Sequence, residues 1–312
     1  MNYTFRNVLA FMGAGIFYLT GHLKAVRKLI LDREIILCLC SHNPDKKLFE
    51  NCVRWLQKKG FTFISVNDLA AIARGETAFP KGAVLITIDD GWKNNKANIV
   101  TIANKYRIPV TIFITTEPVA TGNAYWWSYI NKAHSTGMIG QSASDLKIVT
   151  DDVRLQILET VKARLSLKRE ALTIEELKEI AESRYISFGC HTVTHPILTN
   201  CTENKARFEI CESGKILEQW VGQKITSFAY PNGDFTTREI KILKEAGYQM
   251  AFTTDEKYIT PENIRALYTL PRIEIVETFS FAENICRITG IWSKKREQFN
   301  FLKSRIIKTK LN

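Results

Sequence analysis

Residues 83–92 read AVLITIDDGW, an apolar and mostly β-branched run that ends in two adjacent aspartates and a glycine. The first six residues have the length and composition of a buried strand. Adjacent residues that leave a strand point in different directions, so Asp89 and Asp90 are expected to face different partners. A helix cap explains one aspartate and leaves the other without a role. The stretch therefore predicts a strand whose carboxyl end carries a functional site.

The same alternation of short apolar strands and amphipathic helices continues on both sides of this stretch. Other strand-like runs lie at residues 34–40, 61–65, 108–114, 185–189, 226–230, 248–252 and 272–276. Repeated strand–helix alternation predicts parallel strands that are covered by helices. Seven or eight short strands fit a (β/α) barrel better than a doubly wound sheet. No G-x-G-x-x-G motif follows a strand, so a dinucleotide-binding site has no support. We predict a distorted barrel of about seven parallel strands in an α/β fold.

Residues 121–184 interrupt this rhythm and predict a helical insertion near the mouth of the barrel. Within it, residues 151–183 have the composition of a continuous helix. Trp126 and Trp127 are adjacent, and we predict that they form a wall of a sugar-binding cleft. The alternative is that their rings anchor the inserted helices to the barrel.

A second polar cluster, ISFGCHTVTHP at residues 186–196, follows another apolar strand. His191 and His195 are four residues apart, and on a helical turn such side chains share one face and can reach one ion. One aspartate with two histidines makes a metal site that keeps positions open for water and substrate. The remaining aspartate would then act as a base in metal-assisted hydrolysis.

Four motifs in this order resemble the polysaccharide deacetylases, or carbohydrate esterase family four. ITIDDGW and GCHTVTHP resemble the first two motifs of that family. SFAYPNGDF at 227–235 resembles the third, in a variant that reads F-x-Y-P-x-G, and LPRIEI at 270–275 resembles the strand that closes the domain in the same variant. The resemblance covers about residues 34–280.

The resemblance implies removal of acetyl groups, chiefly N-acetyl, from a hexosamine-containing polysaccharide, and the basic ends of the chain favour a lipid-linked glycan as the alternative substrate. It implies Asp89 as the general base, and a divalent ion, with zinc expected, held by Asp90, His191 and His195. It also implies that the third motif contacts the substrate. In that motif the Tyr230 N–H is expected to hold the oxyanion, Pro231 to fix the loop, and Asn232 to lie against the sugar.

Two positions depart from the best-known members of the family. The third motif lacks their arginine, and a Leu-Pro-Arg stretch stands where they have the histidine that acts as the general acid. We predict that Arg272 reaches the site from another strand, pairs with Asp89 and lowers the pKa of that carboxyl. His42 follows the first strand of the barrel and is the candidate proton donor or substrate contact.

The net charge of +11 is concentrated at the two ends of the chain. Residues 1–33 carry five basic residues against one acidic residue, and residues 291–312 carry seven against one. The stretch VLAFMGAGIFYLTG at 8–21 is shorter than a spanning helix. We predict a membrane-associated segment at 1–33, the catalytic domain at 34–290 and a basic helix at 291–312, with contact to anionic membrane. Two solvated helices packed on the domain are the alternative.

The seven cysteines are odd in number and include no C-x-x-C pair. This pattern predicts a reducing compartment and thiols that act as small buried hydrophobes. We therefore expect a cytoplasmic protein peripheral to the inner membrane, with an N-terminally anchored form as the alternative. The near-neutral body lacks a recognition motif for nucleic acid. An O-acetyl esterase and a catalytically impaired carbohydrate-binding protein on the same scaffold remain the alternatives to the N-deacetylase.

Overall fold

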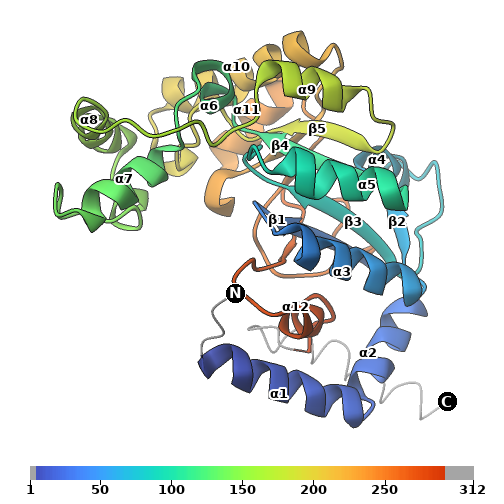
Figure 1. Ribbon diagram of the computed structural model, residues 1–312. Helices are drawn as coiled ribbons and strands as arrows, with labels where there is room; N and C mark the ends of the chain where they lie inside the picture. Colours follow the sequence, from blue (N-terminus) through green and yellow to red (C-terminus); the bar gives the residue numbers. More distant parts are fainter. Residues whose placement is uncertain (1–4, 292–312) are drawn as a thin grey trace.

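Parallel strands form the centre of the computed structural model, which describes residues 5–291 (Figure 1). The strands follow the order β7-β6-β5-β4-β3-β1-β8, and β2 also pairs with β3. All pairings between these strands are parallel. Their bounds are β1 Ile36–Ser41, β2 Thr62–Ile64, β3 Ala83–Ile88, β4 Val110–Ile114, β5 Ile186–Cys190, β6 Ser227–Ala229, β7 Met250–Phe252 and β8 Ile273–Glu274. The sheet curls into a half-barrel, which confirms the predicted distorted barrel.

Helices cover the outside of the curled sheet (Figure 1). They follow most strands in the chain, as parallel pairing requires. Those around the barrel are α3 Lys46–Lys58, α4 Val66–Ala73, α5 Thr101–Tyr106, α6 Thr116–Thr121, α9 Ile174–Ala181, α10 Glu203–Val221, α11 Thr237–Glu245 and α12 Phe281–Ile288. A π-helical stretch, Lys96–Val100, continues directly into α5.

The strands are apolar on both faces because each face packs on a different core. In β3, Val84 and Ile86 belong to the core between the sheet and the helices, whereas Leu85 belongs to the core inside the barrel. Side chains alternate along a strand, so the inward row that contains Leu85 continues to Asp89. The position of the first aspartate therefore follows from the register of the strand.

The insertion forms its own small core beside the barrel. Its helices are α7, Trp126–Ser135, and α8, Asp151–Lys162. Buried Arg154 pairs with Asp151 at 2.6 Å and lies over the ring of Trp126. The core residues of this cluster are Ala124, Trp126, Tyr129, Ile130, Ala133, Leu146, Leu158 and Val161.

The prediction that residues 151–183 are helical throughout is wrong. The chain leaves the helix after α8, and α9 begins with a capping box between Thr173 and Glu176. In between, the Leu172 N–H donates to the Gly91 carbonyl at 3.0 Å. This extended stretch therefore supports the turn that carries the two aspartates.

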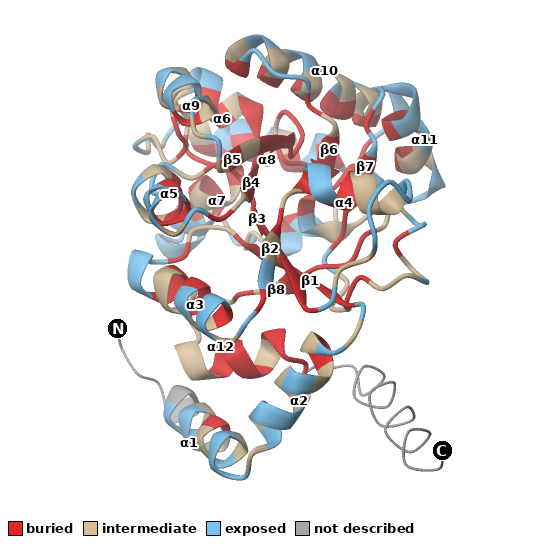
Figure 2. Ribbon diagram, turned by 90° about the vertical axis from the view of Figure 1, so that its right-hand side faces the viewer, coloured by how far each residue is buried: buried red, intermediate tan, exposed pale blue. Residues whose placement is uncertain are grey.

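Helices α1, Phe5–Leu19, and α2, His22–Leu31, lie together at one end of the molecule (Figures 1 and 2). α1 packs against α12. Among residues 5–291, no single helix is long and apolar enough to cross a membrane, and Val8–Leu19 and His22–Leu31 meet that test only as a pair bent by 71°. The division at residues 33 and 290 stays a prediction, and the basic helix predicted at 291–312 lies outside the described residues from 292 onward.

Candidate active site

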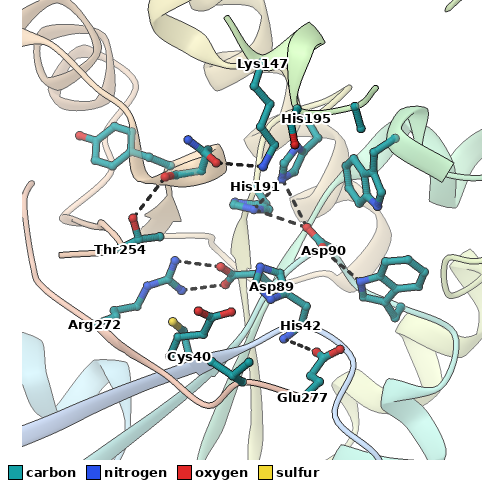
Figure 3. Close-up of a pocket in the computed structure, with 18 of the residues that line it drawn as sticks. Cys40, His42, Asp89, Asp90, Lys147, His191, His195, Thr254, Arg272 and Glu277 are labelled. Carbon is teal, nitrogen blue, oxygen red and sulfur yellow. Dashed lines mark hydrogen bonds and ion pairs between the residues drawn. The ribbon is translucent and has the colours of Figure 1, made fainter. Parts of the chain in front are cut away.

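The candidate residues meet in one cavity, most of them at the carboxyl ends of the strands and Arg272 at the amino end of β8 (Figure 3). His42 follows β1, Asp89 and Asp90 follow β3, His191 follows β5, and Arg272 directly precedes β8. All five line a cavity of about 710 Å³. This volume is typical of pockets that enclose a small molecule or part of a polymer.

A tight turn at Asp90 and Gly91 sends the side chains of the two adjacent aspartates in different directions. Asp90 and Gly91 both have positive φ, at 74° and 84°. A residue with a Cβ would be strained at the φ of Gly91, and its Cβ would lie 2.7 Å from Cδ1 of Ile114, so the turn favours glycine there. The turn leaves Asp89 on the inward row of β3 and directs Asp90 toward the histidines (Figure 3).

Three donor atoms converge at the spacing of a metal site. Nε2 of His191 lies 3.5 Å and Nε2 of His195 lies 3.4 Å from Oδ1 of Asp90, and the two nitrogens are 3.2 Å apart. A tetrahedral zinc ion with bonds of about 2.0–2.2 Å places its donors about 3.3–3.5 Å from one another. The three separations therefore fit such an ion.

The protonation of these side chains supports the same conclusion. Nδ1 of His191 lies 2.7 Å from the Ala229 carbonyl, which only accepts, so Nδ1 is the donor and Nε2 is the nitrogen that faces Asp90. Burial lowers the pKa of His195 well below its ordinary value, which keeps this imidazole neutral. Among the described residues, Oδ1 of Asp90 is buried without a hydrogen bond. A buried carboxylate oxygen that faces two imidazole nitrogens fits a cation.

Trp92 orients the other oxygen of the aspartate. Its indole Nε1 donates to Oδ2 of Asp90 at 2.9 Å. This bond leaves Oδ1 to face the histidines, as outer partners of metal ligands commonly do. Trp92 is part of the first sequence motif. Its hydrogen bond to Asp90 was not predicted, because spacing along the chain does not show which way the indole points.

The two histidines lie on an irregular loop, so the predicted helical turn is wrong. Thr192 and His195 have positive φ, at 69° and 55°. The loop is held by Glu209 of α10, whose carboxylate accepts from the N–H groups of Val193 and Thr194, each at 2.8 Å, and from the Thr194 hydroxyl at 2.7 Å. A fully buried glutamate thus supplies the order that the helical turn was expected to give.

Arg272 pairs with Asp89, as predicted. Its Nη1 and Nη2 donate to the two oxygens of Asp89 at 2.7 and 2.8 Å, and its Nε donates to the Thr253 carbonyl at 2.9 Å. The guanidinium is fully buried and lies near the rings of Phe113 and Phe252. Burial alone would raise the pKa of the Asp89 carboxyl, but the charge of Arg272 holds it below its ordinary value.

His42 lines the cavity on the side of β1 and β8 (Figure 3). The carboxylate of Glu277 accepts from the N–H groups of His42 and Asn43, and Asn95 donates to the His42 carbonyl at 3.1 Å. These bonds fix the backbone and leave the imidazole on the cavity wall. Burial would lower the pKa of His42, but Asp90 and Asp89 outweigh it and raise the pKa above its ordinary value.

The two adjacent tryptophans both line the cavity, and each also contacts neighbouring protein side chains or backbone. Trp126 is 4% exposed, and its indole donates to the His195 carbonyl at 2.9 Å. Trp127 stacks on Tyr125 at 4.6 Å and meets the His195 ring edge-on at 4.6 Å. The ring of Trp127 is the more exposed of the two, so it offers the larger aromatic surface to a sugar.

In the third motif, at residues 227–235, the expected role of the Tyr230 N–H is wrong. Tyr230, Asn232 and Arg272 line the same cavity, but the Tyr230 N–H donates to the Phe252 carbonyl at 3.0 Å. This bond continues the pairing of β6 with β7, so the N–H is not available to an oxyanion. Buried Pro231 begins the following turn, and Asn232 adopts φ 60° and accepts from Lys147 at 3.0 Å.

Backbone strain gathers at the same place. Five described residues other than glycine have positive φ, and four of them, Asp90, Thr192, His195 and Asn232, lie in the loops that carry the site. Such conformations persist where surrounding contacts enforce them, and they are enriched at functional sites. Lys147, which reaches this loop from the insertion, was not identified from the sequence because its partner is 85 residues away.

Comparisons with known proteins agree with this geometry. A family model for polysaccharide deacetylase matches residues 76–251, more than half of the chain. YxkH of Bacillus subtilis (strain 168) is 24% identical over 230 residues, which cover 74% of this chain and 64% of that protein, so the chain spans less than two thirds of this relative. The poly-β-1,6-N-acetyl-D-glucosamine N-deacetylase of Staphylococcus aureus (strain MSSA476) is 23% identical over 254 residues, 81% of this chain and 74% of that protein.

Solved structures show the same fold. The Streptococcus pyogenes deacetylase PplD in complex with acetate has a TM-score of 0.61 at 19% identity, over 81% of this chain and 98% of that one. IcaB from Ammonifex degensii has a TM-score of 0.59 at 18% identity, over 82% and 97%. At these identities the likeness shows the fold alone.

Proposed function

Because the chain belongs to the polysaccharide deacetylase family, we propose that it is a metal-dependent hydrolase that removes N-acetyl groups from hexosamine units of a polysaccharide or lipid-linked glycan. The observation that carries the proposal is the convergence of Asp90, His191 and His195 next to a carboxylate paired with arginine, in one cavity. In the reaction, water adds to the acetyl carbon, the C–N bond breaks, and acetate and an amine leave.

The ion would be held by Asp90, His191 and His195, with zinc proposed because it takes imidazole nitrogen and carboxylate oxygen in such sets. When bound, it supplies Lewis-acid polarisation of the acetyl carbonyl and lowers the pKa of a water molecule. The protein holds these donors in place before the ion binds, through Trp92 and the Ala229 carbonyl.

Asp89 is the proposed general base. Its low pKa keeps it ionised, and Arg272 fixes the plane of its carboxylate through two bonds. Each oxygen keeps a second lone pair, so the carboxylate can still accept the proton of the attacking water. A base that is this weak suits a water molecule whose own pKa has been lowered.

His42 is the proposed general acid. It lies on the wall of the same cavity, and Glu277 holds its backbone. An amine leaves poorly unless it is protonated, so an amide substrate requires a donor at this step. Trp127 is proposed to stack on the sugar ring, with Trp126 mainly supporting the loop of His195.

The test is acetate release from N-acetylglucosamine oligomers, with added zinc or cobalt, by the wild type and by Asp89→Asn. We expect metal-dependent release that falls about 10²- to 10⁴-fold in the variant, because a positioned base contributes that much. Asp152→Asn, on the exposed face of α8, is the matched control and should retain activity. Release from O-acetylated sugars alone would indicate an esterase, and sugar binding without any release would indicate a binding protein.

The location proposed for the enzyme is the cytoplasm, at the periphery of the inner membrane. All seven cysteines are free thiols, and six of them are buried. Burial raises the pKa of Cys52 and Cys190 to about 12, which keeps these thiols protonated and unreactive. The odd number of cysteines and the lack of a C-x-x-C pair support a reducing compartment. Fractionation of cells, with and without a salt wash, tests the location.

A further inference from the structure

Helix α1 has the reverse of the usual arrangement for a helix on a soluble domain. Between Val8 and Leu19 the small residues face the protein: Ala14 is buried, and Ala10, Gly13 and Gly15 are half-buried. The large apolar side chains face outward, with Phe11 exposed by 62%, Tyr18 by 70% and Leu19 by 84%. A surface helix normally buries its large apolar residues and exposes polar ones.

This exposure is specific to α1. Seven of the eleven exposed large apolar residues in the described part of the chain lie on this one helix. Figure 2 shows that the outer surface of α1 is exposed at the end of the molecule away from α10 and α11. Contiguous apolar surface of this kind marks an interaction site, whereas single exposed apolar residues do not.

The charges of the neighbouring helix α2 favour an anionic partner. Residues 5–31 contain no acidic residue, and α2 carries Lys24, Arg27 and Lys28. Two copies of this surface in contact would bring those cations together with no acid on either helix to compensate. An anionic lipid surface instead offers an apolar layer to α1 and negative headgroups to α2.

We propose that α1 docks the enzyme on an anionic membrane surface, lying in the plane of the interface with its large side chains among the lipids. A helix of 15 residues is about 22 Å long, less than the roughly 30 Å of a bilayer core, so it lies on the membrane and does not cross it. α12, against which α1 packs, begins at Phe281, just after Thr278 on the cavity wall. Through α12, the docking helix is thus connected to the segment that forms one wall of the cavity.

The test is co-sedimentation of the full chain with vesicles. Vesicles of phosphatidylcholine alone are compared with vesicles of equal parts phosphatidylcholine and phosphatidylglycerol. We expect binding to the anionic vesicles that weakens as salt rises. A Phe11→Ser/Ile16→Ser double variant should bind at least about tenfold more weakly, because each lost apolar side chain removes buried area.

Two controls separate the causes. Phe208→Ser removes an exposed aromatic from α10 and should not change vesicle binding. Lys24→Gln/Lys28→Gln should reduce the preference for anionic vesicles. All of these variants should release acetate from soluble oligomers like the wild type, so a failed deacetylase proposal would be recognised separately.

The proposal is overturned by any of three results. The wild type does not bind anionic vesicles, or the Phe11→Ser/Ile16→Ser variant binds them as well as the wild type does. The third is a dimer in solution, measured by light scattering, that this double variant converts to a monomer, since that result would identify a second copy as the occupant.

Discussion

At the scale of single residues, the site depends on a charge pair that is completely buried. Arg272 is 0% exposed and donates to both oxygens of Asp89, to the Thr253 carbonyl and to the Thr87 hydroxyl. Removing one partner of such a pair leaves an uncompensated buried charge, which costs more than the pair itself contributes. The arginine therefore links the stability of the barrel interior to the base.

Arg272→Met is expected to lower the free energy of unfolding by about 3–5 kcal/mol, because Asp89 remains buried without its partner. The double variant Arg272→Met/Asp89→Asn should recover part of this loss, since no net charge is then left. Urea unfolding measures both variants. Arg207→Met, which breaks the exposed pair with Glu245, is the control and should change stability little. A double variant no more stable than Arg272→Met would argue against charge coupling.

The proposed proton donor makes a prediction that depends on the leaving group. In His42→Gln, kcat/KM for N-acetylglucosamine oligomers should fall about 10²- to 10⁴-fold. The rate with 4-nitrophenyl acetate should fall far less, because its phenolate leaves without a proton. His134→Gln, on the exposed face of α7, is the matched control. If both substrates lost activity equally, His42 would be a binding residue.

At the scale of elements, helix α10 sets the geometry of the metal loop. Glu209 is fully buried on this helix, and it satisfies two backbone N–H groups between His191 and His195. The imidazoles are thus positioned by a helix that follows them in the chain and does not line the cavity.

Glu209→Gln removes the charge of the carboxylate: the amide can keep one oxygen on the N–H groups of Val193 and Thr194, which both donate to Oε2, but its NH₂ then faces the Lys205 ammonium that pairs with Oε1. We expect a loss of about 1–3 kcal/mol in the free energy of unfolding, since hydrogen bonds to a charged acceptor are replaced by weaker bonds to a neutral one. We also expect about tenfold weaker metal binding, measured by competition with a chelating dye, because the histidine loop relaxes. Glu212→Gln on the same helix pairs only with exposed Lys215 and should leave both quantities unchanged. Unchanged metal affinity in Glu209→Gln would show that the loop is held by other contacts.

The elements themselves were largely predictable, and their contacts less so. The strand at 83–88 was predicted at its observed bounds, because a short β-branched run has little alternative to a buried strand. The break between α8 and α9 was missed, since residues 163–173 favour a helix locally and the contact of Leu172 with Gly91 overrides that preference. The pairing of Arg272 with Asp89 was predicted because the third motif lacks the family's arginine and Arg272 stands in the closing motif. Trp92 and Glu209 act through orientation and distant contacts, which spacing along the chain does not encode.

At the scale of the whole molecule, two surfaces of different character are connected through α12. The cavity is lined by polar and aromatic side chains at the carboxyl ends of the strands, and α1 presents an apolar face beside α12. A polysaccharide attached to a lipid carrier would place sugar in the cavity while α1 contacts the membrane that holds the carrier. A soluble polymer would require only the cavity, so comparing rates on the two substrates in the presence of vesicles separates these possibilities.

The metal site should also affect the stability of the whole domain, because its donors come from two separate strands. Asp90 follows β3 and the histidines follow β5, with β4 between them in the sheet. An ion that binds only the folded state stabilises it by about 2.7 kcal/mol at a concentration one hundred times the Kd. We therefore expect zinc to raise Tm by several degrees and a chelator to reverse the change. Asp90→Asn should fold yet show little shift, whereas Asp152→Asn should behave like the wild type. An equal shift in Asp90→Asn would place the stabilising ion elsewhere in the molecule.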